Sequence, residues 1–270
     1  MSLPLEEKKR VFFGASVEVF WPEKLPKGRL IPEDSRHMTI AFLGQVPWKK
    51  LEEELAAIPK LPFHIGPVGF FDKLLFLPEK TPRVVAWHIT WLEGHEQMRN
   101  LQAALMQWLK HQGYRIDEGP FLSHLSLARA PFDCEEWEES FHQLPLFIKG
   151  LHLYESVGHL NYKPLWSHPL IPPFKEVDHV ADIAFHIYAE NFQQLYLHAQ
   201  HALVFKYPEL LSYISSKREI DSLDTIILNL NKLIAQADQE IGTPFKAVSF
   251  HGKIEQESNQ TLHWEMIVDV

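Results

Sequence analysis

Apolar residues either alternate with polar ones or gather in short runs through the first 170 residues. Alternation and β-branched or aromatic runs predict strands, whereas apolar residues that recur every three or four positions predict helices. The pattern predicts strands at 10–20, 37–44, 63–71, 74–91, 121–131 and 151–160, and helices at 47–59 and 94–114. In the second helix Leu101, Leu105 and Leu109 recur at i+4, and Gly113 ends the pattern.

A break in this pattern comes at Pro172 and Pro173, which suit a short, stiff connection. A fresh strand begins at about Val180. Two helices follow at 191–207 and 222–242, and strands at 244–256 and 261–270 close the chain. The sequence therefore predicts an α/β (α+β) protein with two domains, at 1–171 and 172–270.

The composition is that of an ordinary soluble globular protein, with 46% hydrophobic and 23% charged residues. Cys134 is the one cysteine, so no intramolecular disulfide can form and a reducing compartment is favoured. The first residues show no secretory pattern, and no run approaches the roughly 20 apolar residues of a membrane helix. We expect a cytoplasmic protein without a membrane partner.

Charge is unevenly spread along the chain, whose net charge is −9. Residues 172–270 hold seven basic and fourteen acidic side chains, so most of the excess lies there. A net negative charge argues against long-range attraction to duplex nucleic acid. Local donors in the first part of the chain can still hold a small phosphate ligand.

Two short segments of the same type carry the candidate chemistry. His37 and Thr39 open one predicted strand, and His124 and Ser126 lie in another. In a strand, residues i and i+2 share a face, so each segment presents an imidazole and a hydroxyl together. Two opposed histidines suit phosphodiester hydrolysis, with one taking a proton from water and the other giving one to the leaving oxygen. The hydroxyls would donate hydrogen bonds to the non-bridging phosphate oxygens.

Strict alternation also predicts what lies around these segments. Ala41 and Ala128 would share the faces of the histidines and keep the groove floor open, whereas Phe42 would pack on the opposite face. Arg129 would likewise point away from His124. A phosphate-binding role for Arg129 therefore requires the strand to twist or end there, and the alternative is a surface salt bridge.

The paired segments "HMTIAFLG" and "HLSLARAP", the opening "RVFFGASV" and the later "LYESVGHLNYKPL" resemble the two-histidine (2H) phosphoesterase superfamily over about residues 9–170. The branch most similar is the RNA 2′,3′-cyclic phosphodiesterase, also called 2′-5′ RNA ligase. The resemblance implies a bilobal fold with pseudo-two-fold symmetry and hydrolysis of cyclic phosphates to 2′-phosphates without a cofactor.

By matching position, the resemblance assigns catalytic roles to the two histidines and two hydroxyls and a substrate-binding role to Arg129. Ser126 stands where threonine is commoner, and Ser123 stands where the family usually has proline. Which histidine is the acid and which is the base stays open.

Acidic residues mark both ends of the second domain. Asp178, His179 and Asp182 lie near the entry to its first strand, and Asp269 lies in its last strand. Carboxylates from two strands can hold Ca²⁺ or Mg²⁺ through oxygen ligands. Aspartate is also common as a turn residue at strand ends, so a structural role is the alternative.

Residues 175–270 resemble archease, an acidic cofactor protein of the RNA ligase that acts in tRNA splicing. The resemblance rests on "DHVADIAFHIYAENF", "DSLDTIILNLNKLI" and "PFKAVSFHGKIEQ…TLHWEMIVDV" in this order. It implies a divalent-metal site at Asp182 and Asp269, with Asp178 beside it, and an RNA ligase as partner. Val180 stands where archease has threonine, and the stretch before the 244–256 strand is short. A structural or dimerisation module is the alternative.

The leading interpretation is a metal-independent RNA 2′,3′-cyclic phosphodiesterase that acts on RNA ends or nucleotides and is fused to an archease-like domain for RNA processing. Joining of 2′-5′ linkages is a further activity implied by the resemblance. One alternative is an enzyme for another cyclic phosphate, such as ADP-ribose cyclic phosphate. The other is a non-catalytic protein that binds RNA ends or activates a ligase.

Overall fold

The computed structural model describes residues 7–116, 119–215, 219–249 and 252–270. Within these ranges the chain forms two compact units. Unit 1 holds the residues up to Gln143 together with Ile148–Leu170, and unit 2 holds Leu144–Phe147 together with Ile171–Val270. Both units combine helices with antiparallel sheet, so the chain has a mixed α+β fold. No helix in the described ranges is long and apolar enough to cross a membrane.

Unit 1 is built mainly from strands. Its strands are β1 (Lys8–Glu18), β2 (Arg29–Leu30), β3 (His37–Pro47), β4 (Val68–Leu77), β5 (Val84–Trp91), β6 (His124–Arg129), β7 (Pro145–Gly158) and β8 (Asn161–Pro169). Its α-helices are α1 (Trp48–Glu54), α2 (His95–His111) and α3 (Cys134–Glu139), and two short 3₁₀ helices cover Glu33–Ser35 and Leu55–Ala57. The first residues of β7, up to Phe147, pack with unit 2.

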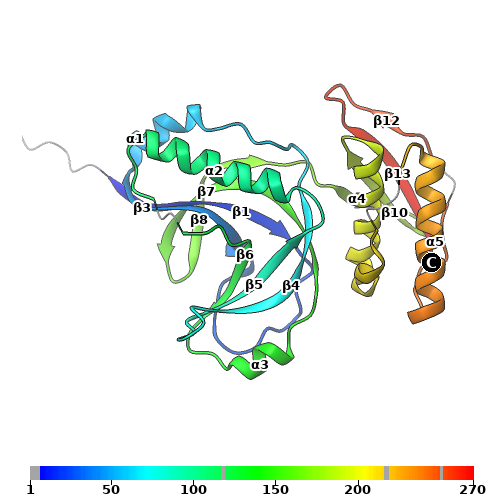
Figure 1. Cartoon of the computed structure of the whole chain (residues 1–270), viewed down its shortest axis with the longest axis horizontal. Coiled ribbons are helices and arrows are strands. Elements are labelled where there is room, and N and C mark those ends of the chain that lie inside the picture. Colours follow the sequence, from blue (N-terminus) through cyan, green and yellow to red (C-terminus); the bar gives the residue numbers. More distant parts are fainter. Residues whose placement is uncertain (1–6, 117–118, 216–218, 250–251) are drawn as a thin grey trace, which may run out of the picture. The chain divides into compact units, whose positions relative to one another are not determined.

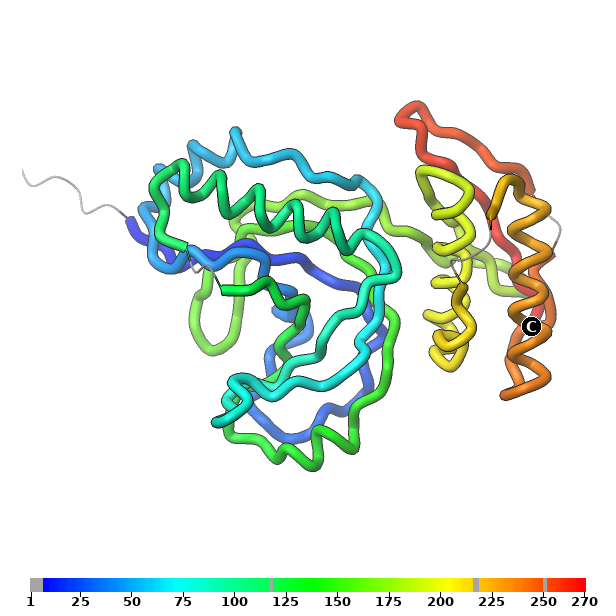
Figure 2. The backbone as a smooth tube through the Cα atoms, viewed as in Figure 1, coloured from blue at the N-terminus to red at the C-terminus, as the bar shows by residue number. Residues whose placement is uncertain are grey.

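The strands of unit 1 form one sheet in the order β1-β3-β6-β5-β4-β7-β8, with β2 paired to β6. The long strand β7 also pairs with β1, so the sheet closes on itself. Figure 2 shows how this order brings blue and green segments, far apart in sequence, next to each other. In particular, β3 and β6 are neighbours, and they carry the two histidine segments.

Helices cover the sheet at two places (Figure 1). Both α1 and α2 pack against β3, whereas α3 packs against β4. The leucine pattern of α2 fulfils its prediction, because Met98, Leu101, Leu105 and Leu109 are all buried. Burial of such an apolar face is what stabilises an amphipathic helix in a protein.

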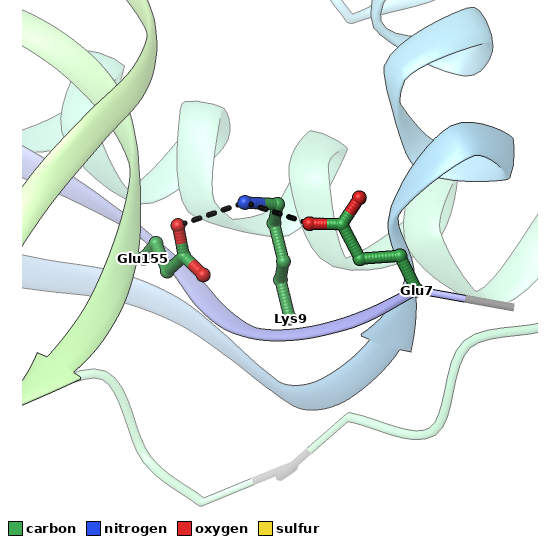
Figure 3. A network of polar contacts seen from close by, with 3 residues as sticks. All are labelled: Glu7, Lys9 and Glu155. Atoms are coloured by element: carbon green, nitrogen blue, oxygen red, sulfur yellow. Dashed lines mark hydrogen bonds and ion pairs between the residues drawn. The ribbon is translucent and has the colours of Figure 1, made fainter. Parts of the chain in front are cut away.

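The pairing of β1 with β7 is marked by an ion-pair network at Lys9 (Figure 3). The Lys9 Nζ lies 3.0 Å from Glu155 Oε2 and 3.3 Å from Glu7 Oε1. The hydrogen bond that Lys9 donates to Glu155 raises the pKa of Lys9, so this ammonium stays charged. Glu7 is exposed, so its pair with Lys9 adds little free energy of folding, whereas the Lys9–Glu155 pair is partly buried.

Unit 2 places a small sheet against two helices. Its strands β9 (Phe174–Val177), β10 (Ile183–Ala189), β11 (Ala247–Val248), β12 (Glu255–Gln256) and β13 (Leu262–Asp269) form the order β11-β13-β10-β9, with β12 beside β13. Its helices are α4 (Phe192–Lys206) and α5 (Leu223–Ile241), with a 3₁₀ helix at Pro208–Tyr213. Eleven consecutive residues of α4 are buried, so this helix forms the centre of the unit.

The predicted elements differ from the structure at a few positions. The helix expected at 47–59 ends as α1 at Glu54 and continues as a 3₁₀ turn. The hairpin partner β8 and the short strand β9 lie outside the predicted strands. The single strand expected at 244–256 is two short strands, β11 and β12, and residues 250–251 between them lie outside the described residues. The domain identities assigned to 1–171 and 172–270 stay predictions.

Candidate active site

The two histidine segments face each other across neighbouring strands. Strand β3 begins at His37 and β6 begins at His124, and Met38 pairs with Leu125 in antiparallel register. One step to either side of this pair, His37 lies across from Ser126 and Thr39 lies across from His124. Directly opposed residues share a face and have Cβ atoms about 5 Å apart. The fold therefore brings both imidazoles and both hydroxyls onto one face of the sheet.

Each histidine is oriented by a backbone carbonyl two residues before it. The Nδ1 of His37 lies 2.8 Å from the Ser35 oxygen, and the Nδ1 of His124 lies 2.8 Å from the Leu122 oxygen. A carbonyl can only accept, so each ring donates from Nδ1–H, and in the neutral ring Nε2 carries the lone pair. Both rings are thus held in the tautomer that leaves Nε2 available for proton transfer.

The same irregularity follows each segment and changes which residues face the site. Between Thr39 and Ala41 the strand β3 holds an extra residue, Ile40, relative to β1. Between Ser126 and Ala128 the strand β6 holds an extra residue, Leu127, relative to β5. An extra residue of this kind is a β-bulge, and it shifts the alternation of faces by one. The two halves of the sheet are therefore related by a pseudo-two-fold repeat of segment and bulge.

The bulges overturn three expectations from strict alternation. Ala41 and Ala128 are 3% and 0% exposed, so they belong to the core and do not form the groove floor. Phe42 is not packed away but is 41% exposed and lines the same cavity as His37. Arg129 also lines that cavity. It lies three residues after Ser126, just as Phe42 lies three residues after Thr39. The bulge at Leu127 is what brings its guanidinium to the site.

Small residues on the flanking strands keep this face open. Gly14 pairs with Thr39, and Ala86 pairs with Ser126, so each hydroxyl lies opposite a residue with little or no side chain. A Cβ atom on Gly14 would lie 3.2 Å from Cδ2 of His37 and 3.3 Å from Cε2 of Tyr154. Gly14 therefore gives the His37 ring the space it occupies.

A cavity of about 730 Å³ opens over the part of this face that carries His37. Its lining includes His37, Thr39, Ser126 and Arg129 from the predicted set, whereas His124 is not one of its lining residues. The lining also includes Arg10, Arg29, Arg83, Phe12, Phe42 and Tyr162. None of the described residues that line it is acidic. A cavity of this volume accepts a nucleotide-sized ligand, and its guanidinium groups favour an anionic one.

His37 lies in an aromatic cage. Its ring centroid is 4.6 Å from that of Phe12, 5.3 Å from Tyr154 and 4.8 Å from Tyr162. Burial among these rings lowers the pKa of His37 to about 4, and the bond to Ser35 opposes this shift only in part. His37 is therefore neutral near pH 7 before an anionic ligand arrives.

His124 has a polar neighbour in place of the cage. His88 of β5 pairs directly with His124, and its Nδ1 binds Asp72 Oδ1 of β4. Burial lowers the pKa of His124, and the charges of His88 and Arg129 lower it further. Both candidate catalytic histidines thus favour the neutral form in the free protein.

The acidic residues of unit 2 are only partly brought together. Ile183 pairs with Val268, so Asp182 and Asp269 lie opposite each other at one end of the strands β10 and β13. Asp269 accepts a 3.0 Å hydrogen bond from Ser249, and Asp182 lies 3.8 Å from His179. Asp178 is exposed before the strand. Among the described residues no group of three or more potential ligands could hold a metal ion, so the cation stays a prediction.

Sequence reasoning missed several residues of the cavity. Arg29 and Arg83 belong to no motif, and they reach the site because their backbones flank Arg129. Phe42 was assigned to the wrong face because a bulge leaves no plain mark in the sequence. The repeat of the two histidine segments could have identified Phe42. Phe42 holds the position in the first segment that Arg129 holds in the second, and Arg129 was already a candidate.

Comparisons with known proteins add one sequence relative and several fold neighbours. No family model matches the chain. An RNA 2′,3′-cyclic phosphodiesterase of Thermotoga maritima is 25% identical over 118 residues, which cover 40% of this chain and 57% of that protein. The chain thus spans little more than half the length of that curated relative.

Two solved structures are similar to this chain at lower sequence identity. A crystal structure described as a phosphoesterase is 22% identical, with a TM-score of 0.44, over 61% of this chain and 99% of that one. The crystal structure of Escherichia coli LigT complexed with 3′-AMP is 21% identical, with a TM-score of 0.43, over the same shares.

Proposed function

We propose that unit 1 is a phosphodiesterase that opens 2′,3′-cyclic phosphates on nucleotides or RNA ends to 2′-phosphates. The observation that carries this proposal is the antiparallel pairing of the two histidine segments. Both rings donate from Nδ1 to a carbonyl, so both Nε2 atoms are free for proton transfer. The distant relative named as an RNA 2′,3′-cyclic phosphodiesterase supports the choice of substrate.

The proposed reaction needs one neutral and one protonated histidine. The neutral ring takes a proton from a water molecule, whose oxygen bonds to phosphorus. The bond from phosphorus to the ribose O3′ breaks, and the protonated ring gives its proton to O3′. The product is a 2′-phosphate with a free 3′-hydroxyl, and acid and base exchange protonation states in the process. Because the site is pseudo-symmetric, either histidine can act as the acid with the other as the base.

The remaining groups stabilise charge on the phosphate. Thr39 and Ser126 lie opposite the two histidines and donate from their hydroxyls to the non-bridging oxygens. Arg129 lines the same cavity and adds a positive charge there. An arriving phosphate anion favours the protonated form of a nearby imidazole, so substrate binding helps to supply the acid that the free protein lacks.

Turnover of a nucleoside 2′,3′-cyclic phosphate in excess EDTA tests this proposal. We expect the wild type to form a single monophosphate isomer. His37→Ala and His124→Ala should each reduce kcat by about 10²–10⁴-fold, since each removes one proton-transfer group. His142→Ala is the matched control, because His142 is exposed and does not line the cavity.

The outcomes of this experiment distinguish an enzyme from a non-catalytic protein that binds RNA ends. If the wild type hydrolyses neither this substrate nor an RNA with a cyclic-phosphate end, the phosphodiesterase proposal is wrong. Unchanged binding of such an RNA to the two histidine variants would count further against a role in phosphate recognition. Hydrolysis of ADP-ribose cyclic phosphate alone would keep the mechanism and change the substrate.

For unit 2 the archease-like role stays a prediction. Its support is the sequence resemblance together with the opposed Asp182 and Asp269. Co-purification with an RNA ligase under gentle conditions is the expected result if the chain works in RNA repair or tRNA splicing. Joining of 2′-5′ linkages by unit 1 would be the same ring opening with an RNA 5′-hydroxyl as the nucleophile in place of water, and it is tested by the same histidine variants.

A further inference from the structure

Three arginines meet at one end of the catalytic cavity. Arg29 of β2 pairs with Arg129 of β6, and Val84 of β5 pairs with Arg129 from the other side. Arg83 directly precedes Val84, and its carbonyl accepts a 2.9 Å hydrogen bond from Ala130. All three arginines line the cavity that contains His37 and Ser126. The backbone pairing therefore fixes three guanidinium-bearing residues around one point of the wall.

Among the described residues, these arginines have no acidic partner. Within the described part of the chain, no ion pair joins Arg29, Arg83 or Arg129 to a carboxylate, and no acidic residue lines the cavity. This contrasts with a chain whose net charge is −9. Positive charges gathered without counter-charges in a cavity favour an anionic ligand.

One cyclic phosphate does not account for this much charge. It is a monoanion, and the two opposed hydroxyls and the two histidines already surround its expected position. The bulge at Leu127 brings Arg129 to this phosphate as well. Arg29 and Arg83 flank Arg129 on the neighbouring strands, at the end of β6 away from His124. A second anionic group of the substrate fits this position.

Chemistry narrows what that second group is. In a nucleotide with a 2′,3′-cyclic phosphate, the 5′ oxygen lies on the opposite side of the ribose from the reacting phosphorus. A phosphate on this oxygen extends away from the histidines. Guanidinium groups bind phosphate oxygens through paired N–H donors, which makes arginine the preferred residue for such a contact.

We infer that Arg29 and Arg83 form a subsite for a phosphate on the 5′ oxygen of the reacting nucleotide, beside the reacting phosphate at Arg129. The inference rests on the proposed function for the position of the cyclic phosphate. The 5′ phosphate is either a terminal phosphate of a mononucleotide or the phosphodiester that links the last two residues of an RNA. Both present the same anionic oxygens to the arginines.

Product binding tests the subsite without turnover. We expect wild-type protein to bind adenosine 2′,5′-bisphosphate about tenfold more tightly than adenosine 2′-phosphate in calorimetry at low salt, because an added charged contact on an exposed surface is worth roughly this factor. In the double variant Arg29→Ala/Arg83→Ala the ratio of the two affinities should fall close to one. Added KCl should shrink the wild-type ratio, since exposed charges are screened.

Arg99→Ala is the matched control. Arg99 lines a different cavity, between β5 and α2, so its loss should leave the ratio unchanged. A wild-type ratio near one, a ratio that survives the double variant, or failure of both ligands to bind overturns the subsite. An equal fall of the affinity ratio in Arg99→Ala would show a general effect of charge, and it would also overturn the subsite.

Turnover measurements distinguish a mononucleotide phosphate from an RNA phosphodiester at the subsite. They also test the subsite separately from the phosphodiesterase activity. Wild-type kcat/KM is compared for adenosine 2′,3′-cyclic phosphate, its 5′-phosphorylated form and a dinucleotide with a cyclic end. A gain for the dinucleotide indicates an RNA end, and a gain for the 5′-monophosphate alone indicates a small nucleotide. Turnover without either gain rejects the subsite and leaves the phosphodiesterase intact. Absence of turnover with a preserved bisphosphate preference rejects the phosphodiesterase and leaves the subsite.

Discussion

At the scale of single residues, the two histidines share one geometry but have different neighbours. Each ring donates from Nδ1 to the carbonyl two positions before it, so the reacting nitrogen is the same in both. The residue paired with His37 on the flanking strand is Ser16, whereas the residue paired with His124 is His88. Pseudo-symmetry thus sets the positions of the rings, and the flanking strands set their proton affinities.

The pKa shifts predict how activity depends on pH. Burial lowers the pKa of His37 to about 4, and it also lowers the pKa of His124 from 6.5. The free protein therefore loses its remaining protonated histidine as pH rises toward 6.5. We expect kcat/KM for a cyclic nucleotide to be highest below pH 6.5 and to fall by about tenfold per pH unit above it. A profile of kcat/KM that is flat or rising between pH 6.5 and 8.5 would contradict this assignment of charge.

The neighbour His88 provides a second prediction at this scale. After burial, the electrostatic interaction with His88 also lowers the pKa of His124. His88→Asn removes this interaction, so the pKa of His124 should rise toward 6.5, as measured by NMR titration of its ring. Ser16→Ala is the control, because Ser16 lies beside the other histidine. A pKa of His124 that moves down or stays fixed in His88→Asn would show that His88 does not influence it.

At the scale of elements, the sequence was sufficient for most strands and helices but not for the bulges. Apolar periodicity located α2, whose buried leucines match the predicted i+4 spacing, and the helix predicted at 222–242 is α5. The H-x-[S/T] segments located the candidate site because alternation holds from His37 to Thr39 and from His124 to Ser126, and the catalytic roles of these residues stay predictions. Beyond them, the extra residues Ile40 and Leu127 depend on how neighbouring strands pair. Such pairing is a tertiary property that a local pattern does not encode.

The bulge after Thr39 leads to a prediction for Phe42. This residue is 41% exposed at the cavity, and the Arg10 guanidinium lies 5.4 Å from its ring centroid. An exposed aromatic face beside a nucleotide site is suited to stack on a base, and loss of one such contact costs about 1–3 kcal/mol. We expect Phe42→Ala to raise KM for adenosine 2′,3′-cyclic phosphate about tenfold, whereas Phe42→Tyr keeps it near the wild-type value. Equal KM values in Phe42→Ala and wild type would exclude stacking on this ring.

At the scale of the whole molecule, the chain does not divide cleanly at residue 171. Leu144–Phe147 at the start of β7 belong to unit 2, while the rest of that strand belongs to unit 1. Phe147 packs against Phe174 and Phe205, with ring centroids 5.4 and 5.5 Å away. A fragment that ends at residue 171 would leave this phenyl ring without these partners. The boundary in sequence is therefore not a boundary in packing.

The same segment links folding to pH through His201. This fully buried histidine of α4 lies with Nε2 3.0 Å from the Leu146 carbonyl, so Nε2–H donates and the ring is neutral. Burial lowers the pKa of His201 to about 3, below its usual value of 6.5. Between these two values the unfolded chain binds a proton that the folded chain does not. Stability from this group is thus complete above pH 6.5 and declines as pH falls toward 3.

We expect the free energy of unfolding to fall by up to about 1.4 kcal/mol per pH unit from this one group as pH drops below 6.5. His201→Gln keeps an amide donor for the Leu146 carbonyl but cannot titrate. It should be less stable than wild type at pH 7.5 because of imperfect packing, yet show a shallower decline toward pH 4.5 in urea unfolding followed by circular dichroism. Since every other titratable group is common to the two proteins, the difference between the two slopes isolates His201. Parallel slopes would mean that protonation of His201 plays no part in the acid sensitivity of the fold.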